Sequence, residues 1–287
     1  MTAQENRRGG WARLPVSLRA VITGIVIALI PANVWPPLLS SLGVPLAATI
    51  EMVFLGFYLW WASGGGPPER THAARGVAFR SGPLSPGQWF WGVMAALSFA
   101  VTIHAAIVLL FRFVPFPIEA FRHGYNLSFI SSMPLKWIAV VVSATSAGIC
   151  EETGFRGYMQ RPIEQRHGAP AAILVSSFFF MLLHLTKAWA MLGMVPIVFG
   201  AGLLLGLIAW SSGSLIPGMI GHVIMDIGLF AYWWTGIAGD FTARPITETG
   251  VDQSFLITCA VLAGTLITVL FAARRLRRIS VSRTVAV

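Results

Sequence analysis

The chain has 287 residues, of which 56% are hydrophobic and only 11% are charged, whereas soluble domains carry about 25% charged residues. No polar block is long enough to form a separate soluble domain. We therefore expect one integral membrane domain over residues 1–287. The formal charge of +9 comes from arginine, because the chain has only two lysines. These arginines cluster at the chain ends and in particular loops, which indicates membrane topology and excludes a nucleic-acid partner.

A membrane-spanning helix needs about 20 apolar residues, and the sequence predicts about eight, so we expect an all-α polytopic helix bundle. The predicted spans are residues 16–34, 44–61, 89–113, 135–154, 170–185, 191–210, 215–234 and 255–273. The first of them follows several arginines, as a secretory signal peptide would, but it lacks a small-residue cleavage pattern. We interpret it as an uncleaved span.

The arginine distribution predicts the orientation of this bundle. Eight spans place both termini on one side, together with the loops after the second and fourth spans. This side collects most of the arginines: Arg7, Arg8, Arg13, Arg19, Arg70, Arg75, Arg80, Arg156, Arg161, Arg166, Arg274, Arg275, Arg277, Arg278 and Arg283. Because positive residues stay on the cytoplasmic side, we expect a multi-pass protein of the cell membrane with cytoplasmic termini. The Glu151 end of span 135–154 should then lie near the cytoplasmic face.

Two adjacent carboxylates, Glu151 and Glu152, close the fourth span. An ionisable group at the bilayer centre costs about 3 kcal/mol on insertion scales and marks a functional site by default. Glu152 and Arg156 are four residues apart, so they share a helix face and can form an ion pair. Glu151 points about 100° away and could serve as a general base. The alternative is an interfacial Glu–Arg pair solvated by headgroups.

Two further spans carry histidines. Phe180 and His184 share one face of the fifth span, and His222 and Asp226 share one face of the seventh. Each motif alone could be structural, as an interfacial histidine or as a His–Asp hydrogen bond between helices. Three spans with ionisable residues favour one shared site, since a chance arrangement would carry the insertion cost three times. His104 lacks an acid one turn away, so we expect a hydrogen-bonded core histidine.

The three motifs together, Glu-Glu-x-x-x-Arg at 151–156, Phe-x-x-x-His at 180–184 and His-x-x-x-Asp at 222–226, resemble the CPBP (ABI) family. These are intramembrane endopeptidases that include the type II CAAX prenyl proteases. The resemblance covers residues 135–235, the expected catalytic core. It implies that Glu151 activates water with help from His184, that Glu152 and Arg156 form a supporting pair, and that His222 and residue 226 stabilise the oxyanion.

Asp226 departs from this family pattern, which often has Asn at the matching position. Asn can donate a hydrogen bond to an oxyanion, whereas an ionised Asp cannot. Asp226 could instead orient His222 and favour its charged form, which would leave His222 as the donor.

The resemblance leaves the cofactor open. Glu151, His184, His222 and Asp226 offer the nitrogen and oxygen ligands that zinc accepts in a catalytic site, and the family is often labelled metalloprotease. Metal-free activation of water by Glu and His is the alternative, which we favour slightly because the sequence lacks a His-Glu-x-x-His motif.

The predicted function is therefore an intramembrane endopeptidase that acts on membrane-associated proteins or peptides, with CAAX-type substrates among the candidates. A non-proteolytic immunity or scaffold protein of the same fold is the first alternative. A transporter or proton relay is the second, but the sequence shows no paired broken helices or inverted repeats. Replacement of Glu151 by Ala distinguishes these functions, because only the protease requires the carboxylate.

Overall fold

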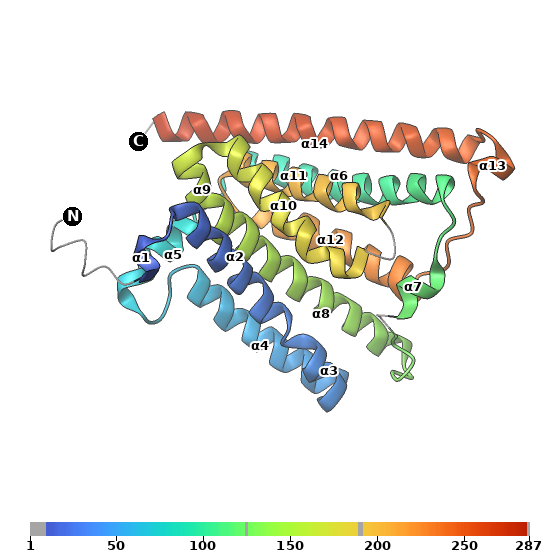
Figure 1. Ribbon diagram of the computed structural model, residues 1–287, viewed down its shortest axis with the longest axis horizontal. Coiled ribbons are helices and arrows are strands. Elements are labelled where there is room, and N and C mark those ends of the chain that lie inside the picture. The colour runs from blue at the N-terminus through green and yellow to red at the C-terminus, as the bar shows by residue number, and fades with distance from the viewer. Residues whose placement is uncertain (1–9, 124–125, 189–191, 286–287) are drawn as a thin grey trace.

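The computed structural model describes residues 10–123, 126–188 and 192–285. These residues form helices without any strand, which confirms the predicted all-α fold (Figure 1). The α-helices are α1 Gly10–Arg13, α2 Val16–Ala32, α3 Trp35–Leu42, α4 Val44–Ala62, α5 His72–Phe79, α6 Pro86–Phe113, α7 Ile118–His123, α8 Met133–Glu151, α9 Gln160–His167, α10 Ala169–Ala188, α11 Met194–Ser212, α12 Ile216–Gly228, α13 Ile246–Thr249 and α14 Gln253–Val285. A short 3₁₀ turn, η2 Glu69–Thr71, and two π-helical segments, η3 Glu152–Met159 and η4 Leu229–Trp234, complete the described elements.

Seven helical segments within the described residues are long and apolar enough to cross a membrane. The other predicted span, 170–185, corresponds to the shorter apolar helix Ala169–Leu185. The first span is longer than predicted, because α2 and α3 together extend it to Leu42.

The fourth predicted span does not end at Gly154. It continues through η3 and α9 as a 35-residue segment, Met133–His167. The polar side chains beyond Gly154 are buried in the bundle, where Arg156 is fully buried and Gln160 donates to the Gly206 carbonyl at 3.0 Å. Both side chains donate to backbone carbonyls of α11, Arg156 to Gly202 at 3.3 Å and Gln160 to Gly206, so the helix need not stop. Arg156 is therefore not a loop charge, and Glu151 lies near the middle of the segment rather than at its end.

Close packing fixes this long segment against α2. A Cβ atom on Gly154 would lie 2.5 Å from the Gly24 carbonyl oxygen and 2.6 Å from the Ala28 Cβ. Only glycine leaves room for the two backbones at this crossing. On the other side of the bundle, the largest apolar cluster joins α6, α11, α12 and α14 through buried residues that include Phe99, Leu205 and Leu276.

Both ends of the described chain lie at the same end of the bundle, and α7 lies at the opposite end (Figure 1). This arrangement agrees with an even number of crossings, while the cytoplasmic location of the termini stays a prediction. Arg7 and Arg8 lie outside the described residues.

Several arginines form hydrogen bonds or ion pairs inside the protein and do not face the membrane surface freely. Arg75 donates to the carbonyls of Gly65 and Gly66 at 2.6 Å each. Arg80 pairs with Glu164 at 2.6 Å, and at the far end of the bundle Arg112 pairs with Asp252 at 2.7 Å. These side chains hold loops and helix ends together, so the arginine count overstates the charge available at the membrane surface.

Candidate active site

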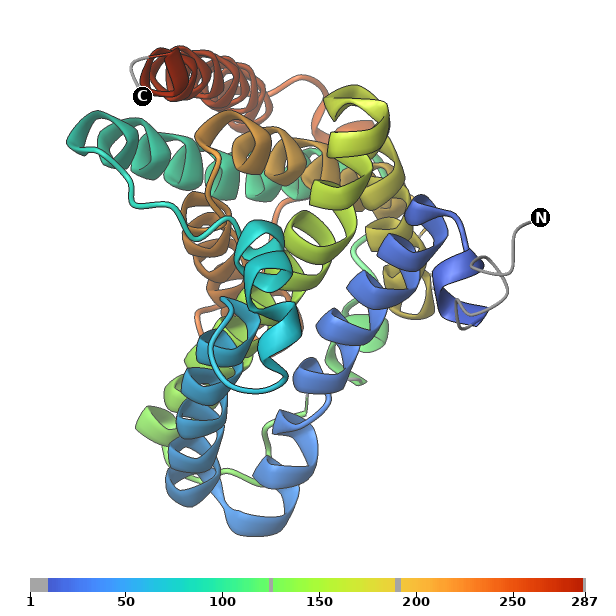
Figure 2. The ribbon, with the colours of Figure 1, turned by 90° about the vertical axis from the view of Figure 1, so that its left-hand side faces the viewer.

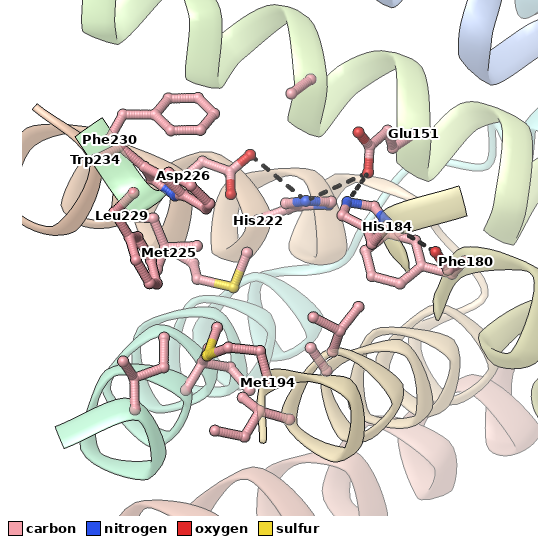
Figure 3. A pocket seen from close by; sticks show the side chains of 17 residues that line it. Glu151, Phe180, His184, Met194, His222, Met225, Asp226, Leu229, Phe230 and Trp234 are labelled. Atoms are coloured by element: carbon pink, nitrogen blue, oxygen red, sulfur yellow. Dashed lines mark hydrogen bonds and ion pairs between the residues drawn. The ribbon is translucent and has the colours of Figure 1, made fainter. Parts of the chain in front are cut away.

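Glu151, His184, His222 and Asp226 line one cavity of about 110 Å³. Figure 3 shows them meeting from three helices: Glu151 from α8, His184 from α10, and His222 and Asp226 from α12. Most other lining residues are apolar. The prediction that these acids and imidazoles face one cavity is therefore confirmed.

Glu152 and Arg156 form the predicted ion pair beneath this cavity. The Arg156 NH1 lies 2.9 Å from the Glu152 Oε1, and both side chains are 0% exposed. The alternative of a pair solvated by headgroups is therefore wrong. The same Glu152 Oε1 lies 3.0 Å from the His222 Nδ1. An ionised carboxylate only accepts, so Nδ1–H is the donor and the imidazole is held by Glu152.

The local backbone at Glu152 and at Gly218 makes the contact between Glu152 and His222 possible. Glu152 begins the π-helical segment η3, and π-helical turns inside α-helices often occur at functional sites. On the facing helix α12, a Cβ atom at Gly218 would lie 2.8 Å from the Glu152 Oε2. Glycine at this position leaves the space that the carboxylate occupies.

The contacts of the Phe180 ring account for the phenylalanine in the Phe-x-x-x-His motif. Its ring centroid lies 4.5 Å from that of His184 and 5.8 Å from that of His222. The Arg156 guanidinium carbon lies 4.4 Å from the Phe180 ring centroid on its face, a cation–π contact. Phe180 therefore packs between the buried ion pair and both imidazoles, and fixes their relative positions.

Hydrogen bonding also orients His184. Its Nδ1 lies 2.7 Å from the Phe180 carbonyl oxygen, which can only accept, so Nδ1 carries the proton. The Nε2 then faces the Glu151 Oε2 at 3.6 Å. The His222 Nε2 lies 3.9 Å from the same oxygen and 3.6 Å from the Asp226 Oδ2. Glu151 thus stands between two imidazole nitrogens.

The predicted metal ligands are Glu151, His184, His222 and Asp226. Their donor atoms suit zinc, and the contact of His222 with Glu152 is of the kind that orients metal-bound histidines. Within the part of the chain that the structure describes, however, no three His, Cys, Asp or Glu side chains are grouped to hold one metal ion. The zinc site stays a prediction, and no step below is routed through it.

Outside the cavity, His104 meets its predicted role. His104 lies 3.2 Å from the Met225 carbonyl through Nε2 and accepts from the Trp233 Nε1 at 3.3 Å, so it is a hydrogen-bonded core histidine. Cys150 is buried in apolar packing.

Sequence reasoning missed one buried acid, Glu51 in α4. It is 0% exposed and accepts from the Ser146 hydroxyl at 2.7 Å. Its position as the lone acid in the apolar run 44–61 was the available signal. It does not line the cavity.

Comparison with known proteins identifies the segment that carries this geometry. Residues 132–228 match the family described as type II CAAX prenyl endopeptidase Rce1-like. No curated protein and no solved structure matches the chain. The matched segment contains all three motifs and therefore all six predicted site residues. The resemblance predicted from the motifs is thereby confirmed for residues 132–228.

Proposed function

We propose that the protein is an intramembrane endopeptidase that hydrolyses peptide bonds with a water molecule activated by Glu151 and His184. One observation carries the proposal: the Glu151 Oε2 faces two imidazole Nε2 atoms at 3.6 and 3.9 Å. These separations are too long for strong direct hydrogen bonds. They suit two groups that share one water molecule.

The hydrogen bonds of His184 assign its part in this step. Because its Nδ1–H is engaged by the Phe180 carbonyl, neutral His184 has an unprotonated Nε2 that can accept a hydrogen bond from the water. Glu151 takes a proton from the water as its oxygen attacks the substrate carbonyl carbon. The protonated Glu151 then gives that proton to the leaving amine as the carbon–nitrogen bond breaks.

His222 supplies the charge for the oxyanion. When both of its nitrogens are protonated, Nδ1–H donates to Glu152 and Nε2–H points into the cavity beside Glu151 and Asp226. A donor held in place before the reaction stabilises the developing oxyanion more than a mobile one. Glu152 and Arg156 are positioning residues in this scheme, because they act through His222.

The apolar cavity and the family match support membrane-associated proteins or peptides as substrates, including CAAX-type chain ends. The lipid bilayer is then the second partner, since substrates would reach the cavity within it. If zinc binds, Glu151, His184, His222 and Asp226 are the residues that would hold it, and it would supply Lewis-acid polarisation.

Turnover of a quenched membrane-anchored peptide library in proteoliposomes tests the proposal. Glu151→Gln should lower turnover by about 100–10,000-fold, the usual contribution of a general base. Glu248→Gln removes an exposed carboxylate of α13 and should leave turnover unchanged. Both variants must keep the wild-type melting temperature, so that loss of activity is not loss of fold.

Unchanged turnover in Glu151→Gln would exclude the mechanism. A wild-type protein that cleaves no member of the library, together with a cellular role that survives Glu151→Gln, would favour the scaffold or immunity function. Loss of activity on chelation and its recovery with zinc would add the metal to the site without removing Glu151 from it.

A further inference from the structure

A second cavity lies at the end of the bundle where both termini lie, and Figure 2 looks onto this end. Its volume is about 620 Å³, and its walls come from α5, α9, α11, α14 and the loop after α5. It shares no lining residue with the candidate active site. Four charged side chains line it: Arg80, Arg161, Glu164 and Arg277. We call it the basic cavity.

The single carboxylate of this cavity is fully engaged. Glu164 accepts from the Arg80 NH2 at 2.6 Å through one oxygen and from the Arg161 NH1 at 2.7 Å through the other. Burial lowers the pKa of Arg80, and the neighbouring Glu164 opposes that shift. Three guanidinium groups against one carboxylate leave an excess of positive charge, and this excess lies with Arg161 and Arg277.

Both of these arginines have donors to spare. The Arg161 Nε is buried and has no hydrogen-bond partner among the described residues. Arg277 lies over the Trp210 ring, with its guanidinium carbon 4.4 Å from the ring centroid. No Asp or Glu that the structure describes forms a salt bridge with Arg277. Stacking fixes the guanidinium plane while its N–H edge stays available for an anion.

The surroundings place the basic cavity at the depth of lipid headgroups. Three arginine–tryptophan stacks occur at this end: Arg75 on Trp61, Arg275 on Trp91 and Arg277 on Trp210. These tryptophans lie at the end of α4, the beginning of α6 and the end of α11. Tryptophan is enriched where spanning helices meet the headgroup layer, and arginine is the preferred partner of phosphate.

We propose that the basic cavity is a phosphate-binding site in which Arg161 and Arg277 donate to the phosphate oxygens. The depth of the cavity favours the headgroup of an anionic phospholipid as the source of the phosphate, and free inorganic phosphate is the other source. The site is independent of the proposed peptidase activity, since none of its residues lines the catalytic cavity.

The experiment uses the full chain, purified in detergent after incubation with vesicles of phosphatidylcholine containing phosphatidylglycerol. Native mass spectrometry counts the retained phosphatidylglycerol, and thermal shift with added inorganic phosphate measures the soluble ligand. Arg161→Gln combined with Arg277→Gln should weaken retention by about tenfold or more, as expected when two charge-assisted bonds are lost. Arg278→Gln is the matched control, because it removes the same charge from the next residue of α14 and Arg278 does not line the cavity.

Arg277→Gln alone is included because it disturbs no ion pair of the fold, so its effect cannot arise from a lost Arg161–Glu164 contact. Retained phosphatidylglycerol that is lost in these variants supports a headgroup site. Stabilisation by inorganic phosphate without retained lipid supports the same site with a soluble source. Equal retention in wild type and double variant, or an equal loss in Arg278→Gln, would overturn the proposal.

Discussion

The candidate active site and the basic cavity differ in the charged side chains that they contain. At the candidate active site, two carboxylates and two imidazoles line the cavity, and beneath it Arg156, Glu152 and His222 form one buried chain of contacts. In the basic cavity, one carboxylate serves two arginines, and a third arginine rests on an aromatic ring. Glu151 lies near the middle of the segment Met133–His167, whereas the basic cavity lies at the end of the bundle that holds both termini.

This difference follows from the solvent. Within the hydrocarbon layer, an ionised group without a partner is expensive, which fits the direct contacts of Glu152 with Arg156 and His222. At the headgroup layer, water and lipid phosphates can complete an incomplete set. A surplus of guanidinium groups at that depth therefore suits the proposed phosphate site, whereas the contacts of Glu152 with Arg156 and His222 hold one imidazole in place.

The largest contrast should appear in stability. Arg156→Met leaves the buried Glu152 without its cation, and removing one partner of a buried pair typically destabilises by about 3–5 kcal/mol. Arg277→Gln should change stability by about 0.5 kcal/mol or less, as for other surface substitutions. Thermal unfolding of both variants in the same detergent measures the difference. Similar melting temperatures would break the distinction between the cavities.

A smaller change tests positioning alone. Gly218→Ala places a methyl group against the Glu152 Oε2, so the carboxylate and the His222 that it holds should move. We expect turnover to fall by about tenfold to a hundredfold, because displacements of about 1 Å can have that effect. Gly200→Ala on α11 is the control, since a Cβ there meets nothing within 4 Å. Equal turnover in both variants would show that the position of Glu152 does not matter.

Asp226→Asn should have the smallest effect. In a metal-free site Asp226 need only orient His222, and Asn can also donate to the oxyanion. We expect turnover within about tenfold of wild type, the effect of a change of about one hydrogen bond. Turnover after chelation and zinc add-back makes the test decisive. An inactive variant, with zinc-dependent wild-type activity, would assign Asp226 to a metal instead.

Helical periodicity predicted the contacts that lie within one helix. Glu152 with Arg156, Phe180 with His184 and His222 with Asp226 are all four residues apart, so they share a face whatever the rest of the chain does. The shared cavity was also predictable, because isolated polar groups in apolar helices need one another.

Contacts between helices were not predictable from spacing. The bond from His222 to Glu152 depends on the space at Gly218, and the continuation of α8 through η3 depends on neighbours that bury Arg156 and Gln160. The basic cavity joins Arg80, Arg161 and Arg277, which are far apart in the chain. The arginine pattern did predict that such residues gather at one end, but not that several of them form hydrogen bonds or ion pairs inside the protein.

The cavity of the candidate active site extends toward one end of the bundle. Beyond His222 its wall continues through Phe121, Met194 and Trp234, which belong to α7, the start of α11 and η4, at the end of the bundle away from both termini (Figures 1 and 3). If the termini are cytoplasmic, as the arginine bias predicts, this wall leads toward the outer leaflet. A polypeptide segment that approached from that leaflet would then meet the apolar part of the cavity before it reached Glu151 and His184.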